Sequence, residues 1–136
     1  MQIGTQFENF KINDQFDNQY SVNNKTKKLI FVFSKAKGHI VKDYLDTKSD
    51  DFLQKKDALF IADVSAMPTI IQWFVLPGLK KHKYAIVVLN DDELSKKYKT
   101  DTNKDTIVII YLNNNKIINI KYLTTKEELI NNLKEN

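Results

Sequence analysis

Three runs of nearly uninterrupted apolar residues stand out along the first two thirds of the chain. They cover Lys27–Ser34, Ala58–Val64 and Tyr84–Leu89, and each has the length of a single strand. A strand without alternation of apolar and polar residues is typical of a sheet that is covered on both faces. The three runs therefore predict the central strands of a buried sheet.

The segments between and after these runs carry helix signals. Residues Ile40, Val41, Tyr44 and Leu45 are spaced as on one face of a helix that starts near Gly38. Other segments combine a polar cap residue with a helical pattern. The further predicted helical segments are 49–56 with Ser49 as the cap, 65–82 with Ser65 as the cap and a stop or kink at Pro77-Gly78, and 90–98 with Asn90 as the cap.

Both ends of the chain predict hairpins. Residues 7–22 hold spaced aromatic and aliphatic residues around a turn-rich centre, which predicts one or two short strands in a hairpin-like excursion. Thr106–Leu112 and Lys116–Leu123 flank an asparagine turn and predict a second hairpin. The last segment, 124–136, predicts a helix whose start carries a capping box formed by Thr125 and Glu128.

The order of elements indicates one α/β domain that covers residues 1–136. Strands and helices alternate, and the chain closes with two strands and a helix. This order predicts a mixed central sheet with helices on both faces. The length of 136 residues, with 42% apolar and 28% charged residues, fits a single globular domain.

Composition excludes several functions. The absence of cysteine removes disulfides, thiol redox chemistry, zinc–thiolate sites and cysteine nucleophiles. All 21 basic residues are lysines, and the net charge is only +4. Because arginine is the usual reader of guanine and phosphate, sequence-specific binding of nucleic acid is not expected. The longest apolar stretch, 70–79, contains Gln72 and Pro77-Gly78, so we expect no transmembrane segment, and residues 1–10 show no signal peptide.

The order of elements resembles the thioredoxin fold in its larger form. The opening "IGTQFENFKINDQFDNQYSV" resembles the start of the peroxiredoxin/AhpC–TSA family, and "ALFIADVSAMP" with "GLKKHKYAIVVLNDD" is similar to the uncharacterised, often secreted YtfJ-like group. The resemblance implies a thioredoxin-like three-layer α/β/α sandwich with an N-terminal β-hairpin extension. It also implies a periplasmic location if a signal peptide has been removed, and a cytoplasmic one otherwise.

The redox site of that fold family is lost from this sequence. The family's CxxC motif follows the first central strand and opens the next helix, and it falls on Gly38-His39-Ile40-Val41. The cis-proline that faces the cysteines in thioredoxins is replaced at Asp105-Thr106. The resemblance therefore predicts a branch without thiol oxidoreductase, peroxidase or disulfide isomerase activity.

Five residues form a candidate ligand site at the same corner. His39 lies at the predicted helix start, where free N–H groups favour anions, and Lys37 and Gly38 precede it. Asp63 ends a predicted strand, and Asp105 occupies the former proline position. The alternative interpretation is a solvated loop with scattered lysines and an Asp63 that binds local backbone.

Signatures of metal and cofactor sites are missing from the sequence. His39 and His82 are far apart, and neither an HxH nor an HExxH pattern occurs. There is no GxSxG, P-loop or GxGxxG motif. We expect neither a metal nor a cofactor.

The segment "TIIQWFVLPGL" gives the best functional signal. Trp73, Phe74, Val75 and Leu76 follow one another on a predicted helix and must point in several directions. One interpretation is a surface for a protein partner or a homodimer, centred on Trp73, Phe74 and Leu76. The other is a helix wedged between the sheet and a neighbouring loop.

The leading hypothesis is therefore a non-catalytic thioredoxin-like binding or protein-interaction module. The alternative is a small-molecule or anion-binding protein, or a non-thiol enzyme, that uses the Gly38-His39 corner with Asp63 and Asp105.

Overall fold

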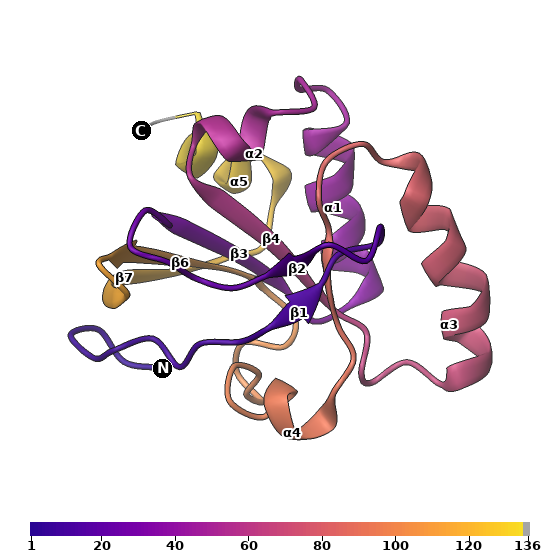
Figure 1. Cartoon of the computed structure of the whole chain (residues 1–136), viewed down its shortest axis with the longest axis horizontal. Coiled ribbons are helices and arrows are strands. Elements are labelled where there is room, and N and C mark those ends of the chain that lie inside the picture. The colour runs from indigo at the N-terminus through magenta and orange to yellow at the C-terminus, as the bar shows by residue number, and fades with distance from the viewer. Residues whose placement is uncertain (135–136) are drawn as a thin grey trace.

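A mixed sheet of five strands, in the order β5-β4-β3-β6-β7, forms the centre of this computed structural model, which describes residues 1–134 (Figure 1). Strand β3 lies in the middle, parallel to β4 and antiparallel to β6. Apart from this sheet, β1 and β2 form an antiparallel hairpin of their own within residues 1–134. The strands are β1 (Ile12–Asn13), β2 (Gln19–Tyr20), β3 (Lys28–Val32), β4 (Ala58–Asp63), β5 (Val87–Leu89), β6 (Ile107–Asn113) and β7 (Lys116–Leu123).

The helices connect and cover these strands. Residues 135–136, the end of the predicted last helix and of the predicted domain, lie outside the described residues. The helices are α1 (Lys35–Leu45), α2 (Phe52–Lys55), α3 (Thr69–Val75), the 3-10 helix η1 (Leu76–Lys81), α4 (Asp92–Ser95) and α5 (Lys126–Leu133).

Strand β3 is buried along its whole length and divides the core into two halves. Leu29 and Phe31 belong to the core on one face of the sheet, and Ile30 and Val32 to the core on the other. This alternation is the period-2 geometry of a strand. The prediction that the Lys27–Ser34 run lies at the heart of a mixed sheet is confirmed.

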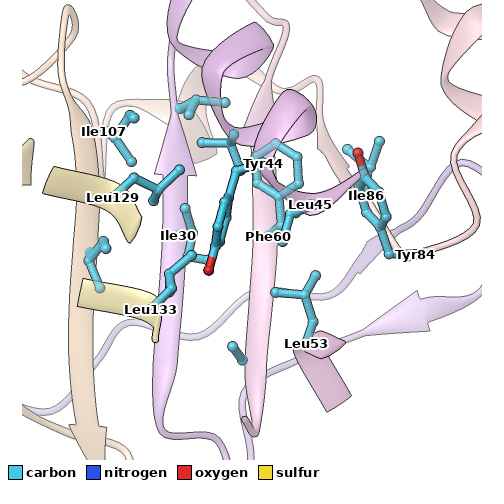
Figure 2. Packing of buried hydrophobic residues seen from close by; sticks show 14 of the residues in the cluster. Ile30, Tyr44, Leu45, Leu53, Phe60, Tyr84, Ile86, Ile107, Leu129 and Leu133 are labelled. Carbon is cyan, nitrogen blue, oxygen red and sulfur yellow. The ribbon is translucent and has the colours of Figure 1, made fainter. Parts of the chain in front are cut away.

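One half of the core is covered by helices. Figure 2 shows Tyr44 of α1, Leu53 of α2 and Leu129 of α5 packed on Ile30 and Phe60 of the central strands. All five side chains are buried. Helices thus supply the whole cover on this face.

The opposite half is covered mainly by the N-terminal segment. The ring of Phe7 stacks on Tyr98, which follows α4, with 5.5 Å between centroids. Tyr98 also packs on Phe31 of β3, and its hydroxyl donates a 2.6 Å hydrogen bond to the carbonyl oxygen of Glu8. Burial, followed by the nearby Glu8 carboxylate, raises the pKa of Tyr98. The third layer is therefore an extended segment with one short helix.

The N-terminal hairpin covers the edge of the sheet at β5. Asp14 forms an antiparallel bridge with Val87. The side chain of Gln15 accepts a 2.7 Å bond from the Ile86 N–H and donates a 2.8 Å bond to the Tyr84 carbonyl oxygen. These contacts satisfy backbone groups that an uncovered edge strand would leave open.

Several helix starts differ from the predicted ones. Helix α1 begins at Lys35 instead of Gly38, because the Ser34 hydroxyl caps it by accepting a 3.3 Å bond from the Lys37 N–H. Helix α2 begins after Asp51, and the predicted cap Ser49 instead donates a 2.8 Å bond to the Asp51 carboxylate. Of these two helices, only α1 has a side chain that caps its free N–H groups.

The later helices show the same effect. Helix α3 begins after Pro68, since the predicted cap Ser65 binds Asp63. Helix α4 is capped by Asp91 instead of Asn90, and the Asp91 carboxylate accepts from the Leu94 N–H at 3.1 Å.

At the C-terminal end the turn and cap predictions are confirmed. Asn114 and Asn115 have positive φ values of 50° and 67° in the β6–β7 turn, as a tight hairpin requires. Thr125 and Glu128 form the predicted capping box.

The hydrogen bonds of Gln15 between the N-terminal hairpin and the sheet edge give the first prediction. Replacing the buried Gln15 by Ala should lower the free energy of unfolding by about 2 kcal/mol, because the Ile86 N–H and the Tyr84 carbonyl lose their partner. Urea unfolding measures the change, with exposed Gln19→Ala as the control on the same hairpin. Equal stability of the two variants would contradict this role.

Candidate functional site

The predicted anion corner lies inside helix α1. Gly38 is buried, and its N–H donates a 3.0 Å bond to the Ser34 carbonyl oxygen, so this group is not available to a ligand. His39 is exposed on the helix surface. The Lys37 ammonium donates a 3.3 Å bond to the carbonyl oxygen of Thr124. The helix opens at Ser34 and Lys35, three residues before the position expected for the lost CxxC motif.

Asp63 is buried and fully engaged with two serines. One carboxylate oxygen accepts from the N–H and the hydroxyl of Ser65 at 2.9 and 2.6 Å. The other accepts a short hydrogen bond from the hydroxyl of Ser95. These bonds tie the end of β4 to helix α4. They match the interpretation in which Asp63 bonds locally.

The structure does not gather the predicted ligand residues in one cavity. Gly38 and Asp63 line a cavity of about 50 Å³ between α1, β4 and α3. The residues that line it do not include Lys37, His39 or Asp105, and Asp105 is exposed before β6. Sites for small molecules occupy roughly 300–1,000 Å³. This cavity has room for a water molecule but not for a metabolite.

A polar cluster that the sequence analysis did not anticipate joins α1 to the segment before β5. The Nδ1 atom of His82 lies 2.7 Å from a carboxylate oxygen of Asp46. The Tyr84 hydroxyl donates a 3.0 Å bond to the same oxygen. Burial, together with this hydrogen bond, raises the pKa of Tyr84. The cluster connects the end of α1 to the segment before β5, because the side chains of His82 and Tyr84 both contact the carboxylate of Asp46.

Helix α3 presents its large apolar side chains to solvent. The exposed fractions are 67% for Ile70, 42% for Ile71, 76% for Trp73 and 80% for Phe74. Gln72, in the middle of this run, is only 8% exposed. A helix normally buries its apolar stripe and exposes its polar residues. In α3 this arrangement is inverted, and the four exposed residues are called the α3 face below.

The buried amide of Gln72 fixes the rotation of α3. Its nitrogen donates to the carbonyl oxygens of Val64 and Met67 at 3.1 and 3.0 Å. Its oxygen accepts a 2.9 Å bond from the side-chain amide of Asn90. These bonds connect α3 to the ends of β4 and β5. With Gln72 turned inward, positions 70, 71, 73 and 74 must turn outward.

The three predicted interface residues divide between two sides of this helical segment. Trp73 and Phe74 lie on the α3 face, so the alternative of a helix wedged under a loop does not describe them. Leu76 is half-buried and packs against the core. Ile70 and Ile71 extend the exposed surface instead, and the sequence analysis missed them because nearly all of residues 70–76 are apolar.

Comparisons with known proteins identify the fold. No protein-family model matches the chain, and no curated protein matches it. The thioredoxin domain of a thiol-disulfide oxidoreductase from Bacteroides vulgatus matches with a TM-score of 0.63 and 15% identity over 99% of this chain and 97% of that one. StoA from Bacillus subtilis matches with a TM-score of 0.62 and 19% identity, over 93% and 96%.

A peroxiredoxin-type structure is also similar. The peroxidoxin BcpB from Mycobacterium tuberculosis matches with a TM-score of 0.62 and 9% identity, over 98% of this chain and 94% of that one. These likenesses confirm the predicted thioredoxin-like α/β fold with its N-terminal hairpin. The chain has this fold without a single cysteine.

Residues 1–134 also bear on metal and membrane binding. In that part of the chain no group of three or more acidic or histidine side chains is placed to hold a metal ion. Across the same residues, every helix is too short or too polar to cross a bilayer.

The engagement of Asp63 gives a second prediction. Asp63→Ala should lower the free energy of unfolding by about 2 kcal/mol, since the buried Ser95 hydroxyl and the Ser65 N–H lose their acceptor. The control is Asp105→Ala at an exposed position, which should change stability by less than about 0.5 kcal/mol. If thermal and urea unfolding find the two variants alike, Asp63 does not have this structural role.

Proposed function

We propose that this chain is a non-catalytic binding module with a thioredoxin-like fold, and that it docks onto its target through the α3 face. The observation that carries the proposal is the inverted helix, with Trp73 and Phe74 at 76% and 80% exposure around a buried Gln72. The absence of cysteine supports the non-redox part of the proposal.

The fold itself does not require an apolar α3 face. The inward side of the helical segment holds Gln72, Val75, Leu76 and Leu79, which already attach it to the body. Burying a Phe or Ile side chain is worth about 1.5–3 kcal/mol relative to leaving it in water. Burying the four exposed apolar side chains of the α3 face against a target would therefore stabilise the complex.

The residue types also suit a docking surface. Aromatic side chains, Trp above all, dominate the energetics of binding sites and lose little conformational entropy on contact. Ile70 and Phe74, one turn apart, lie opposite the buried Gln72, and Ile71 and Trp73 flank them on the two sides. Partly buried Met67 precedes them.

The alternative function, a ligand or anion site at the Gly38-His39 corner, has less support. The cavity that Gly38 and Asp63 share measures about 50 Å³, and the Asp63 carboxylate is occupied by Ser65 and Ser95. An open docking surface on α3 needs no such cavity.

The third prediction separates docking from folding. The double variant Trp73→Ser plus Phe74→Ser should keep its free energy of unfolding within about 0.5 kcal/mol of the parent, because both side chains are exposed. Leu79→Ala, on the inward side, should lose about 2–5 kcal/mol. A large loss of stability in the double variant would mean that the α3 face serves the fold.

The fourth prediction tests docking itself. Trp73 is the only tryptophan of the chain, so a fluorinated tryptophan gives one ¹⁹F signal located on the α3 face. We expect this signal to shift or broaden in a complete cell extract that includes membranes, because docking removes the ring from water. The Phe74→Ser variant should keep the sharp line of the isolated protein, while Tyr122→Ser, exposed on β7, should behave as the parent. An unchanged parent signal in the extract would contradict the proposed function.

A further inference from the structure

We infer that the α3 face docks onto the surface of an anionic lipid bilayer, into which Trp73 and Phe74 insert while nearby lysines contact the headgroups. The inference rests on the proposed function and names its target. It is carried by the charge, the shape and the residue types of the α3 region.

The segment of the sequence that contains α3 and η1 carries charge of one sign only. Residues 64–90 contain Lys80, Lys81 and Lys83 but no aspartate or glutamate. Lys80 and Lys81 end η1, which continues directly from α3. Asp14, Asp17 and Asp91 line the same pocket as Lys80, but Asp14 and Asp91 already accept hydrogen bonds from backbone N–H groups. A partner for the exposed lysines of this segment is therefore expected to be anionic.

Helix α1 adds Lys35 and Lys42 next to η1, around the cavity on the inward side of α3. The pKa of Lys42 is lowered, first by burial and then by the charges of Lys81 and Lys35, while Asp46 and Asp43 act in the opposite direction. Lys35 and Lys42 of α1 thus lie within electrostatic range of each other and of η1. Of the two acids, Asp46 is held by His82 and Tyr84.

The position of α3 suits insertion into an interface. In Figure 1 α3 is the outermost element on the right, and the N-terminus and β7 lie at the other side of the molecule. Its apolar side chains project from a convex helix. A flat lipid surface accepts a projecting Trp or Phe at headgroup depth, where these amphipathic rings are enriched. Apolar residues next to lysines are the usual composition of interfacial helices.

A second copy of this chain is a less suitable target. A two-fold dimer places the same surface of both copies face to face. With the two α3 helices parallel, self-association through the α3 face would bring Lys80 and Lys81 close to their equivalents, and residues 64–90 provide no acid to pair with them. A lipid phosphate supplies the missing negative charge.

The docking would be peripheral and reversible. Helix α3 has seven residues, whereas a helix needs about 20 apolar residues to span a bilayer. A few inserted side chains and a few lysines each contribute modestly, so both are needed for stable attachment. Binding should therefore require anionic lipid and weaken as the salt concentration rises.

The fifth prediction uses the full chain and vesicles of phosphatidylcholine with or without phosphatidylglycerol. We expect cosedimentation and a blue shift of the Trp73 emission with the mixed vesicles, and neither with phosphatidylcholine alone. Phe74→Ser should weaken binding roughly tenfold or more, because one large inserted side chain is removed. It leaves the Trp73 reporter in place.

A matched pair of charge variants separates local contact from net charge. Lys80→Gln plus Lys81→Gln should weaken binding about 25-fold, at roughly a factor of five for each lysine near the surface. Lys25→Gln plus Lys116→Gln removes the same charge from exposed positions outside the α3 region and should have little effect. Equal losses from the two pairs would overturn the inference, because attraction would then follow net charge alone.

The remaining outcomes distinguish this inference from the proposed function. If mixed vesicles do not bind but the ¹⁹F signal of Trp73 changes in a membrane-free extract, or sedimentation shows a dimer that Trp73→Asp dissociates, the target is a protein. The lipid inference is then wrong and the proposed function stands. If vesicles fail and the signal is unchanged in every extract, both are wrong.

Discussion

The orientation of one short helix depends on a single buried amide, and the functional account depends on that orientation. Gln72 makes hydrogen bonds to Val64, Met67 and Asn90, which lie where β4 and β5 end. A buried amide without partners would cost several kcal/mol, so the helix cannot rotate without breaking this network. Its large apolar side chains consequently remain in water.

The two halves of the core are formed mainly by elements other than α3. The sheet is buried on both faces, by α1, α2 and α5 on one side and by the N-terminal segment with Tyr98 on the other. The segment Gly38–Val41, which the resemblance assigned to the lost CxxC motif, is here the interior of a helix that is capped by Ser34 and starts at Lys35. Four of the exposed large apolar side chains lie together on α3, and none of them lies in that segment.

The sequence was sufficient for most of the fold because its central strands are long, apolar and flanked by clear turns. Burial of all of β3 and the asparagine turn at 114–115 followed from local patterns. Helix starts were less predictable, since Ser34 and Asp91 cap their helices in place of neighbouring polar residues, whereas α2 starts after Asp51 without a side-chain cap. The α3 face was predicted only in part, because a run of apolar residues has no period and its one polar residue turns inward. Long-range partners such as Asp46 and His82 have no signal in a single sequence.

The most direct test of the central claim is the fluorescence of Trp73 in the dilute, isolated protein. The account predicts emission as red as that of an indole in water, and quenching by acrylamide close to that of free tryptophan, because 76% of the side chain is exposed. Both should hold at concentrations where sedimentation finds only monomer. Blue-shifted emission that acrylamide cannot quench in that monomer would show that the ring is buried, and the account would be wrong.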